Sequence, residues 1–163
     1  MLPPRLRKAL IILTAISTGL LSGAMLCAGR GLPPFWSSLT PAQLATWTQQ
    51  HLLPFATTLV PLSEIAFVFG LSSLLVHLSP TEKSRPWTLL AGICLFCAVI
   101  TYFLGTVPVQ DVLGRGSVPD AVLTQIIGRW AISHWIQFTL EFVAFLASLR
   151  ALSFACSGIT AES

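Results

Sequence analysis

Near its C-terminus the chain reads RWAISHWIQFTLEFVAFLASLRAL, from Arg129 to Leu152. On a helix that turns about 100° per residue, a polar stripe about 60° wide runs along this stretch. The stripe consists of Trp130, His134, Gln137, Glu141 and Ser148, and the other positions are apolar almost all round the helix. A charge in contact with lipid hydrocarbon costs several kcal/mol, so we expect the stripe to face protein or trapped water.

The composition extends this picture to the whole chain. Of 163 residues, 54% are hydrophobic and only 9% are charged, whereas a soluble domain usually carries about a quarter of its residues as charge. Four stretches are long enough, at about 20 residues each, to cross a bilayer as helices. They lie near Ala9–Ala28, Phe55–Leu78, Trp87–Val107 and Ala131–Leu152. The sequence therefore predicts an all-α fold: one domain over residues 1–163, an integral membrane four-helix bundle in the lipid bilayer.

The net charge of +3 does not indicate a nucleic-acid partner, because the basic residues flank the expected spans. Arg5, Arg7, Lys8, Lys83, Arg85 and Arg150 flank one side, and Arg30, Arg115 and Arg129 flank the other. The side richer in Lys and Arg faces the cytosol in membrane proteins. We therefore expect a multi-pass protein with both termini cytosolic, and we interpret the basic N-terminus as a signal anchor rather than a cleaved signal.

The segment between the first two spans contains turn residues and a helix signal. Residues 29–38 include Gly31 and the pair Pro33-Pro34, which predict a loop. Thr40-Pro41 then has the pattern of a helix N-cap followed by proline. Residues 42–53 are amphipathic at helical spacing. We expect a short interfacial helix there, between the first and second spans.

The first span carries small residues at four-residue spacing, namely Ala15, Gly19 and Gly23. Small residues on one face let membrane helices approach closely. This face favours packing inside the bundle, and it is also the place where a helix of a protein partner would pack.

Polar residues inside the spans point to a candidate site. Glu64 and Glu141 are expected near the middle of the membrane, and Tyr102, His134 and Gln137 in its outer half. An ionisable residue at such depth is by default a functional candidate, with His134, Glu141 and Glu64 as catalytic proton-handling groups. The alternative is that the same residues only make hydrogen bonds between helices.

Two other kinds of chemistry receive less support. A di-iron bundle supplies Glu-x-x-His pairs from two helices, and this sequence has none, so we expect no metal. Cys94 and Cys97 form a C-x-x-C pair within an apolar helix, not at a helix start where a thiolate is stabilised. We interpret both cysteines as small apolar residues.

Short motifs around the last two spans resemble the anthrone oxygenase-like family of small four-helix membrane proteins. That family has a P-x-N-x-x-L motif after the third helix and W-x-x-x-H-x-x-R at the start of the fourth. Here the corresponding stretches are PVQDVL from Pro108 to Leu113 and WAISHWIQ from Trp130 to Gln137. Gln110 stands in place of asparagine, and Gln137 stands in place of arginine, which removes a fixed charge with a rigid donor fork.

The resemblance implies oxidation of an anthrone-type polycyclic aromatic to a quinone by molecular oxygen, without a bound cofactor. His134 or Glu141 would remove a ring-methylene proton, and Gln137, Gln110 and Tyr102 would hold the substrate's oxygens. Trp130 would stack on the hydrophobic aromatic ring system. The competing hypothesis is a non-catalytic accessory or assembly subunit of a larger membrane complex.

Overall fold

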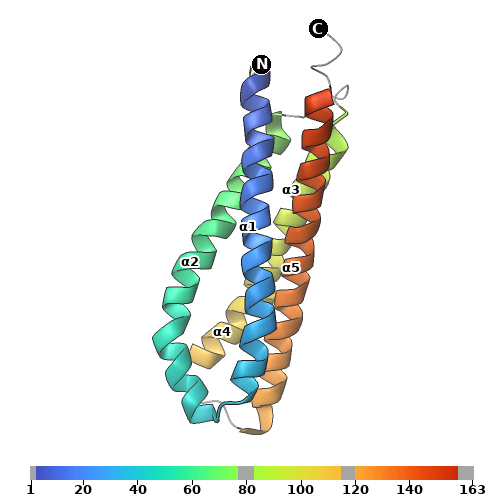
Figure 1. Ribbon diagram of the computed structural model, residues 1–163. Coiled ribbons are helices and arrows are strands. Elements are labelled where there is room, and N and C mark those ends of the chain that lie inside the picture. The colour runs from blue at the N-terminus through green and yellow to red at the C-terminus, as the bar shows by residue number, and fades with distance from the viewer. Residues whose placement is uncertain (1–2, 77–82, 115–119, 158–163) are drawn as a thin grey trace.

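The computed structural model describes residues 3–76, 83–114 and 120–157 (Figure 1). Its helices are α1 (Pro4–Ser37), α2 (Pro41–Val76), α3 (Arg85–Thr101), the π-helix η1 (Tyr102–Thr106), α4 (Val107–Gly114) and α5 (Asp120–Ser157). The described residues contain no strand, so the predicted all-α class is confirmed. The long helices lie side by side, and α1 begins at the same end of the molecule at which α5 ends (Figure 1).

Four helical segments among the described residues are long and apolar enough to cross a membrane. They are Arg5–Ser37, Pro54–Val76, Arg85–Gly114 and Ala121–Cys156. The four predicted spans are thus all present as apolar helices, and the first, third and fourth are longer than expected. The last two residues of the expected second span, and Arg115, lie outside the described residues.

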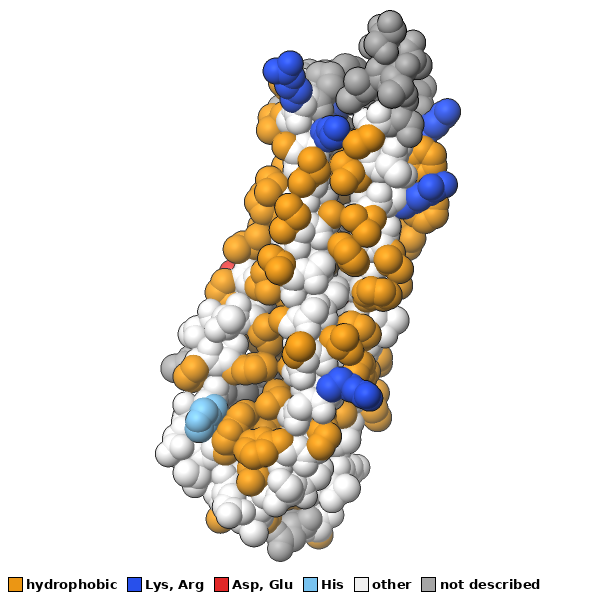
Figure 2. Space-filling view, in the orientation of Figure 1, with side chains coloured by type: hydrophobic (Ala, Val, Ile, Leu, Met, Phe, Trp, Pro, Cys, Tyr) orange, Lys and Arg blue, Asp and Glu red, His pale blue; other side chains and the backbone are white. Residues whose placement is uncertain are grey.

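The outer surface has the character of a lipid-facing surface. Leu104 and Ile132 are 76% and 65% exposed, and apolar side chains are spread along much of the face shown in Figure 2. A soluble protein rarely exposes apolar patches of this extent. The long apolar helices and their apolar exterior together indicate a multi-pass membrane protein.

The predicted loop over residues 29–38 is wrong, because α1 continues through Pro33 and Pro34 to Ser37. Tertiary packing explains the difference. Trp36 is 1% exposed, and its ring lies 4.7 Å from that of Trp130 and 5.6 Å from that of Trp47. Burial of this large ring holds the last turn of α1 in place despite the two prolines.

The segment expected to form a separate interfacial helix is instead the first part of α2, which runs unbroken past Pro54 and Pro61. Its predicted start is confirmed by a capping box. The Thr40 amide donates to Gln43 Oε1 at 2.9 Å, and the Gln43 amide donates to Thr40 Oγ1 at 3.3 Å. Each residue thereby satisfies a backbone donor that the helix start leaves free.

The third span also continues past its predicted end at Val107. Proline lacks an amide hydrogen, and in a regular α-helix its ring collides with the carbonyl four residues earlier. Immediately before Pro108 the helix widens into the π turn η1, which the Val107 amide closes on the Tyr102 carbonyl. The wider turn accommodates the proline, and α4 then continues to Gly114. Such π turns occur frequently at functional sites.

Small residues hold the helices close together. A Cβ atom on Gly19 would lie 3.0 Å from the Phe145 ring, and Ala15 is 4% exposed. This part of the small-residue face of α1 therefore packs inside the molecule, largely against α5. Gly23 differs, since nothing lies within 4 Å of the position that its Cβ would take.

Candidate functional site

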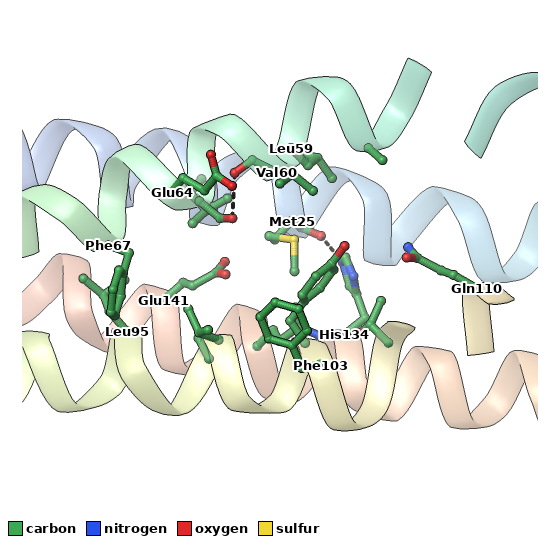
Figure 3. Close-up of a pocket in the computed structure, with 18 of the residues that line it drawn as sticks. Met25, Leu59, Val60, Glu64, Phe67, Leu95, Phe103, Gln110, His134 and Glu141 are labelled. Atoms are coloured by element: carbon green, nitrogen blue, oxygen red, sulfur yellow. Dashed lines mark hydrogen bonds between the residues drawn. The ribbon is translucent and has the colours of Figure 1, made fainter. Parts of the chain in front are cut away.

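A cavity of about 220 Å³ lies between α1, α2, α3, η1, α4 and α5 (Figure 3). The structure brings all seven residues of the predicted site onto its lining: Glu64, Tyr102, Gln110, Trp130, His134, Gln137 and Glu141. Most of the remaining lining is apolar and includes Phe55, Leu59, Phe67, Leu95, Val99 and Phe103. An apolar cavity with a few convergent polar groups is the usual form of a small-molecule site.

The exposed part of the cavity lining lies on the apolar helical segments. Glu64 and Phe103 both line the cavity and are both exposed, Phe103 to 61%. Each belongs to a segment that is long and apolar enough to span a membrane. The exposed edge of the cavity therefore lies at α2 and η1.

His134 connects α5 to α1. Its side chain is 2% exposed, and its Nε2 lies 2.7 Å from the Met25 carbonyl oxygen. A carbonyl oxygen only accepts, so Nε2 carries the hydrogen and Nδ1 is the acceptor of the neutral ring. The imidazole also stacks on Trp130, with ring centroids 4.4 Å apart at 18°. Because Nε2 already carries a hydrogen, this ring can take up a proton only at Nδ1.

Gly29 makes the contact with His134 possible. A Cβ atom on Gly29 would lie 2.9 Å from His134 Cδ2 and 3.3 Å from Trp135 Cζ2. Only a residue without a side chain lets α1 lie this close to the imidazole. The sequence gives no sign of this role, because Gly29 falls in the segment where we predict a loop.

Glu141 is the buried acid of the cavity. It is 4% exposed, and its Oε2 atom has no hydrogen-bond partner among the described residues. Figure 3 shows its carboxyl group reaching from α5 into the cavity. No Lys or Arg is among the described residues of the lining. A buried carboxyl group with an unpartnered oxygen lowers the stability of the folded protein. That oxygen is available to a ligand.

Glu64 lies on the opposite wall of the cavity from Glu141 (Figure 3). It comes from α2 and is exposed at the mouth, whereas Glu141 is buried. The two predicted acids thus share one cavity but occupy different environments: one at the entrance and one inside.

Gln137 is held by a polar cluster at η1. Its Nε2 donates to Thr106 Oγ1 at 2.5 Å and to the Ser133 carbonyl at 3.3 Å. The Thr106 and Ser133 hydroxyls are 3.0 Å apart, and Ser133 Oγ also donates to the Thr101 carbonyl at 3.4 Å. With both amide hydrogens of Gln137 occupied, its Oε1 is the atom left to accept from a ligand.

Sequence reasoning missed Thr106 and Ser133. Ser133 sits next to Gly105, whose Cβ would collide with the serine hydroxyl. The only sign of this cluster in the sequence is the pair Gly105-Thr106 shortly before Pro108. The sequence does not indicate the π turn that contains this pair.

The other predicted ligand-binding residues lie around these groups. Trp130 is 2% exposed, its indole Nε1 has no partner among the described residues, and its ring contacts Trp36. Tyr102 begins η1 and is half-buried, as is Gln110 on α4. In Figure 3, Gln110 and Glu141 lie towards opposite ends of the cavity, with His134 between them.

The possible metal ligands and the cysteines of the C-x-x-C pair were also located in the structure. No group of three His, Cys, Asp or Glu residues that could hold a metal ion is found in the described part of the chain. Cys94 is buried, Cys97 is half-buried, and both are free thiols.

Comparison of the chain with protein families, with curated proteins and with solved structures gave no match.

Proposed function

We propose that this protein is a four-helix membrane bundle that oxidises a lipophilic polycyclic aromatic compound of the anthrone type with molecular oxygen. The observation that carries the proposal is the buried carboxyl group of Glu141 in an apolar cavity, with an Oε2 atom that has no partner among the described residues. A membrane-embedded acid without a partner costs stability and is by default a functional group. The resemblance of the Pro108–Leu113 and Trp130–Gln137 motifs to anthrone oxygenase-like proteins supports the choice of reaction.

In the proposed reaction Glu141 is the base. Its carboxylate takes a proton from the ring methylene of the bound aromatic, and the resulting carbanion reacts with oxygen. Overall, one CH2 group and one O2 molecule give one C=O group and one water. No step draws electrons from the protein, so the chain has only to bind, to orient and to accept a proton.

His134 has a positioning role in this proposal. The Met25 carbonyl occupies its Nε2 hydrogen, and the ring stacks on Trp130. The imidazole therefore fixes α5 against α1 and supports one wall of the cavity. Of the two bases considered from the sequence, Glu141 is the better candidate because no described group engages its Oε2 atom.

Hydrogen bonds to the substrate's oxygens come from two kinds of group. Gln137 presents Oε1, which accepts from a phenolic hydroxyl, because its amide hydrogens are held by Thr106 and Ser133. Tyr102 and Gln110 can donate to a carbonyl or phenolate oxygen. The substrate would enter from the bilayer past Phe103 and Glu64, where the cavity is open.

We further propose that both termini are cytosolic. Arg5, Arg7 and Lys8 lie at the start of the first span, and Arg85 lies at the start of the third. The part of α2 before Pro54 lies outside the apolar span, which begins at that residue. We propose that this part extends from the membrane at the outer interface, with Trp47 as an interfacial aromatic residue.

A second candidate function is that of an accessory subunit in a larger membrane complex. One observation favours it: α1 leaves open space at Gly23, where a helix of another protein can approach closely. The other two small residues of this face, Ala15 and Gly19, pack within the molecule.

The test is oxygen uptake by the detergent-purified protein with a panel of anthrones, together with mass spectrometry of co-purified molecules. We expect substrate-dependent oxygen uptake that Glu141→Gln lowers by at least 100-fold, in line with loss of a general base. Thr139→Val, an exposed change on the same helix, should leave the rate unchanged. Full activity of Glu141→Gln would refute the base assignment. No uptake with any anthrone, together with a stoichiometric protein partner, would favour the second candidate.

A further inference from the structure

The charge balance of the cavity is one-sided. Glu141 and Glu64 both line it, and no described Lys or Arg does. On α5 itself the basic residues nearest to Glu141 in sequence are Arg150 and Arg129, nine and twelve residues away. At a rise of 1.5 Å per residue, these distances are about 13 Å and 18 Å along the helix axis. The ionised form of Glu141 therefore has no counter-charge in the described part of the chain.

A positively charged ligand in the cavity could lie next to the carboxyl group of Glu141. The Glu141 side chain is 4% exposed, it points into the cavity (Figure 3), and its Oε2 atom has no partner among the described residues. At the low dielectric of an apolar site, the attraction between an ion pair is several times stronger than in water. A buried carboxylate is strongly destabilising when alone and much less so when paired.

The walls of the cavity suit an organic cation better than a hydrated metal ion. Aromatic rings line it from several sides: Phe55 and Phe67 on α2, Tyr102 and Phe103 on η1, and Trp130 on α5. The faces of aromatic rings attract quaternary ammonium groups. A metal ion needs several hard oxygen or nitrogen ligands, and the described residues contain no group of three such side chains.

We propose that this cavity binds lipophilic organic cations, namely ammonium groups that carry an aromatic ring. Glu141 provides the counter-charge inside the cavity, the surrounding rings contact the cation's apolar groups, and Glu64 attracts the cation at the mouth. The cation reaches the cavity from the bilayer, along the lateral opening beside Phe103. Binding of such a cation does not depend on the proposed oxidation, and it would compete with a neutral aromatic substrate for the same space.

The probe is benzyltrimethylammonium, and the matched control ligand is neopentylbenzene, which has the same shape with carbon in place of the charged nitrogen. Binding to the full chain in detergent is measured by calorimetry and by tryptophan fluorescence, because Trp130 lines the cavity. We expect saturable binding of one cation per chain, at least tenfold tighter than binding of neopentylbenzene. Equal affinity of the two ligands would overturn the proposal, and this comparison needs no variant.

Variants locate the counter-charge. Glu141→Gln should weaken cation binding at least tenfold, and Glu141→Asp, which keeps the charge, should weaken it less. Glu64→Gln should have a smaller effect than Glu141→Gln, because Glu64 is exposed at the mouth. The control is Ser148→Ala, in the same buried stripe but outside the cavity lining, with its hydroxyl bonded to the Ala144 carbonyl. Unchanged cation affinity in folded Glu141→Gln would overturn the proposal even if anthrone oxidation were observed.

Discussion

His134 and Met25 are 109 residues apart in the chain, and the Nε2 atom of His134 donates a 2.7 Å hydrogen bond to the Met25 carbonyl oxygen. This bond crosses from α5 to α1 beside the cavity, and the imidazole that makes it stacks on Trp130. His134, which the sequence suggests as a catalytic base, therefore also links α5 to α1. Its contribution to stability and its contribution to activity can be separated by experiment.

Replacement of His134 by Phe keeps a ring beside Trp130 and removes the hydrogen bond to Met25. We expect the free energy of unfolding to fall by about 1–3 kcal/mol, the usual effect of leaving a buried polar partner unpaired. Thermal or denaturant unfolding in detergent, followed by circular dichroism, measures the change. Thr139→Val is the control, because the exposed Thr139 hydroxyl bonds only within its own helix. Equal stability of the two variants would contradict the structural role of His134.

Two glycines of α1 should respond in opposite directions to the same change. Gly29→Ala places a Cβ atom 2.9 Å from His134 Cδ2 and should destabilise the protein by about 1–3 kcal/mol through overpacking. Gly23→Ala meets nothing within 4 Å, and alanine is the better helix former by about 1 kcal/mol, so this variant should be slightly more stable. The two unfolding curves, measured side by side in the same detergent, test the close approach of α1 to α5. A shift of both variants in the same direction would argue against it.

Glu141 should lower the stability of the protein that carries it. Its buried Oε2 atom lacks a partner among the described residues, so Glu141→Leu should raise the free energy of unfolding by about 1–3 kcal/mol. The same variant should lose substrate-dependent oxygen uptake. Ser148→Ala serves as the matched control, since its hydroxyl already has a partner and its removal should not stabilise. If Glu141→Leu is less stable than the wild type, the carboxyl group makes a favourable interaction in the fold and the assigned role is wrong.

The broad features of this protein were predictable because they depend on local sequence. Apolar length alone identifies the four spans, and the helical period alone places the polar stripe of α5 on a buried face, where its five members are each at most 4% exposed. The seven predicted site residues meet on one cavity because antiparallel spans bring residues of similar depth together. The depth of a residue in the membrane follows from its position along its span, so the sequence alone can predict which residues meet.

What the sequence did not reveal depends on contacts between distant residues. The pair Pro33-Pro34 predicts a loop, but burial of Trp36 against Trp130 keeps α1 helical to Ser37. Pro108 predicts the end of a helix, but the π turn before it lets the helix continue. The same turn contains Thr106, which contacts Gln137. Local propensity cannot anticipate such effects, because the compensating contacts come from another helix.

The Thr106–Gln137 contact also predicts a measurable effect. Thr106→Val keeps the shape of the side chain and removes the hydroxyl that accepts from Gln137 Nε2 at 2.5 Å and pairs with Ser133 Oγ at 3.0 Å. We expect a loss of about 1–3 kcal/mol in the free energy of unfolding. Thr101→Val, whose hydroxyl bonds only to the Cys97 carbonyl of its own helix, should cost less. A loss no larger than that of Thr101→Val would show that the cluster does not hold Gln137.

The proposed orientation predicts the side from which single cysteines react. Cys156 is exposed near the end of α5, and Ser38 is exposed between α1 and α2, which Figure 1 places at the other end of the molecule. With cytosolic termini, a membrane-impermeant maleimide should label Ser38→Cys in intact cells, in a chain whose four cysteines are replaced by alanine. A chain that retains Cys156 alone should react only after the membrane is opened. The opposite pattern would mean that the excess of Lys and Arg near the termini does not set the topology. In that case the interfacial placement of the first part of α2 would have to move to the cytosolic side.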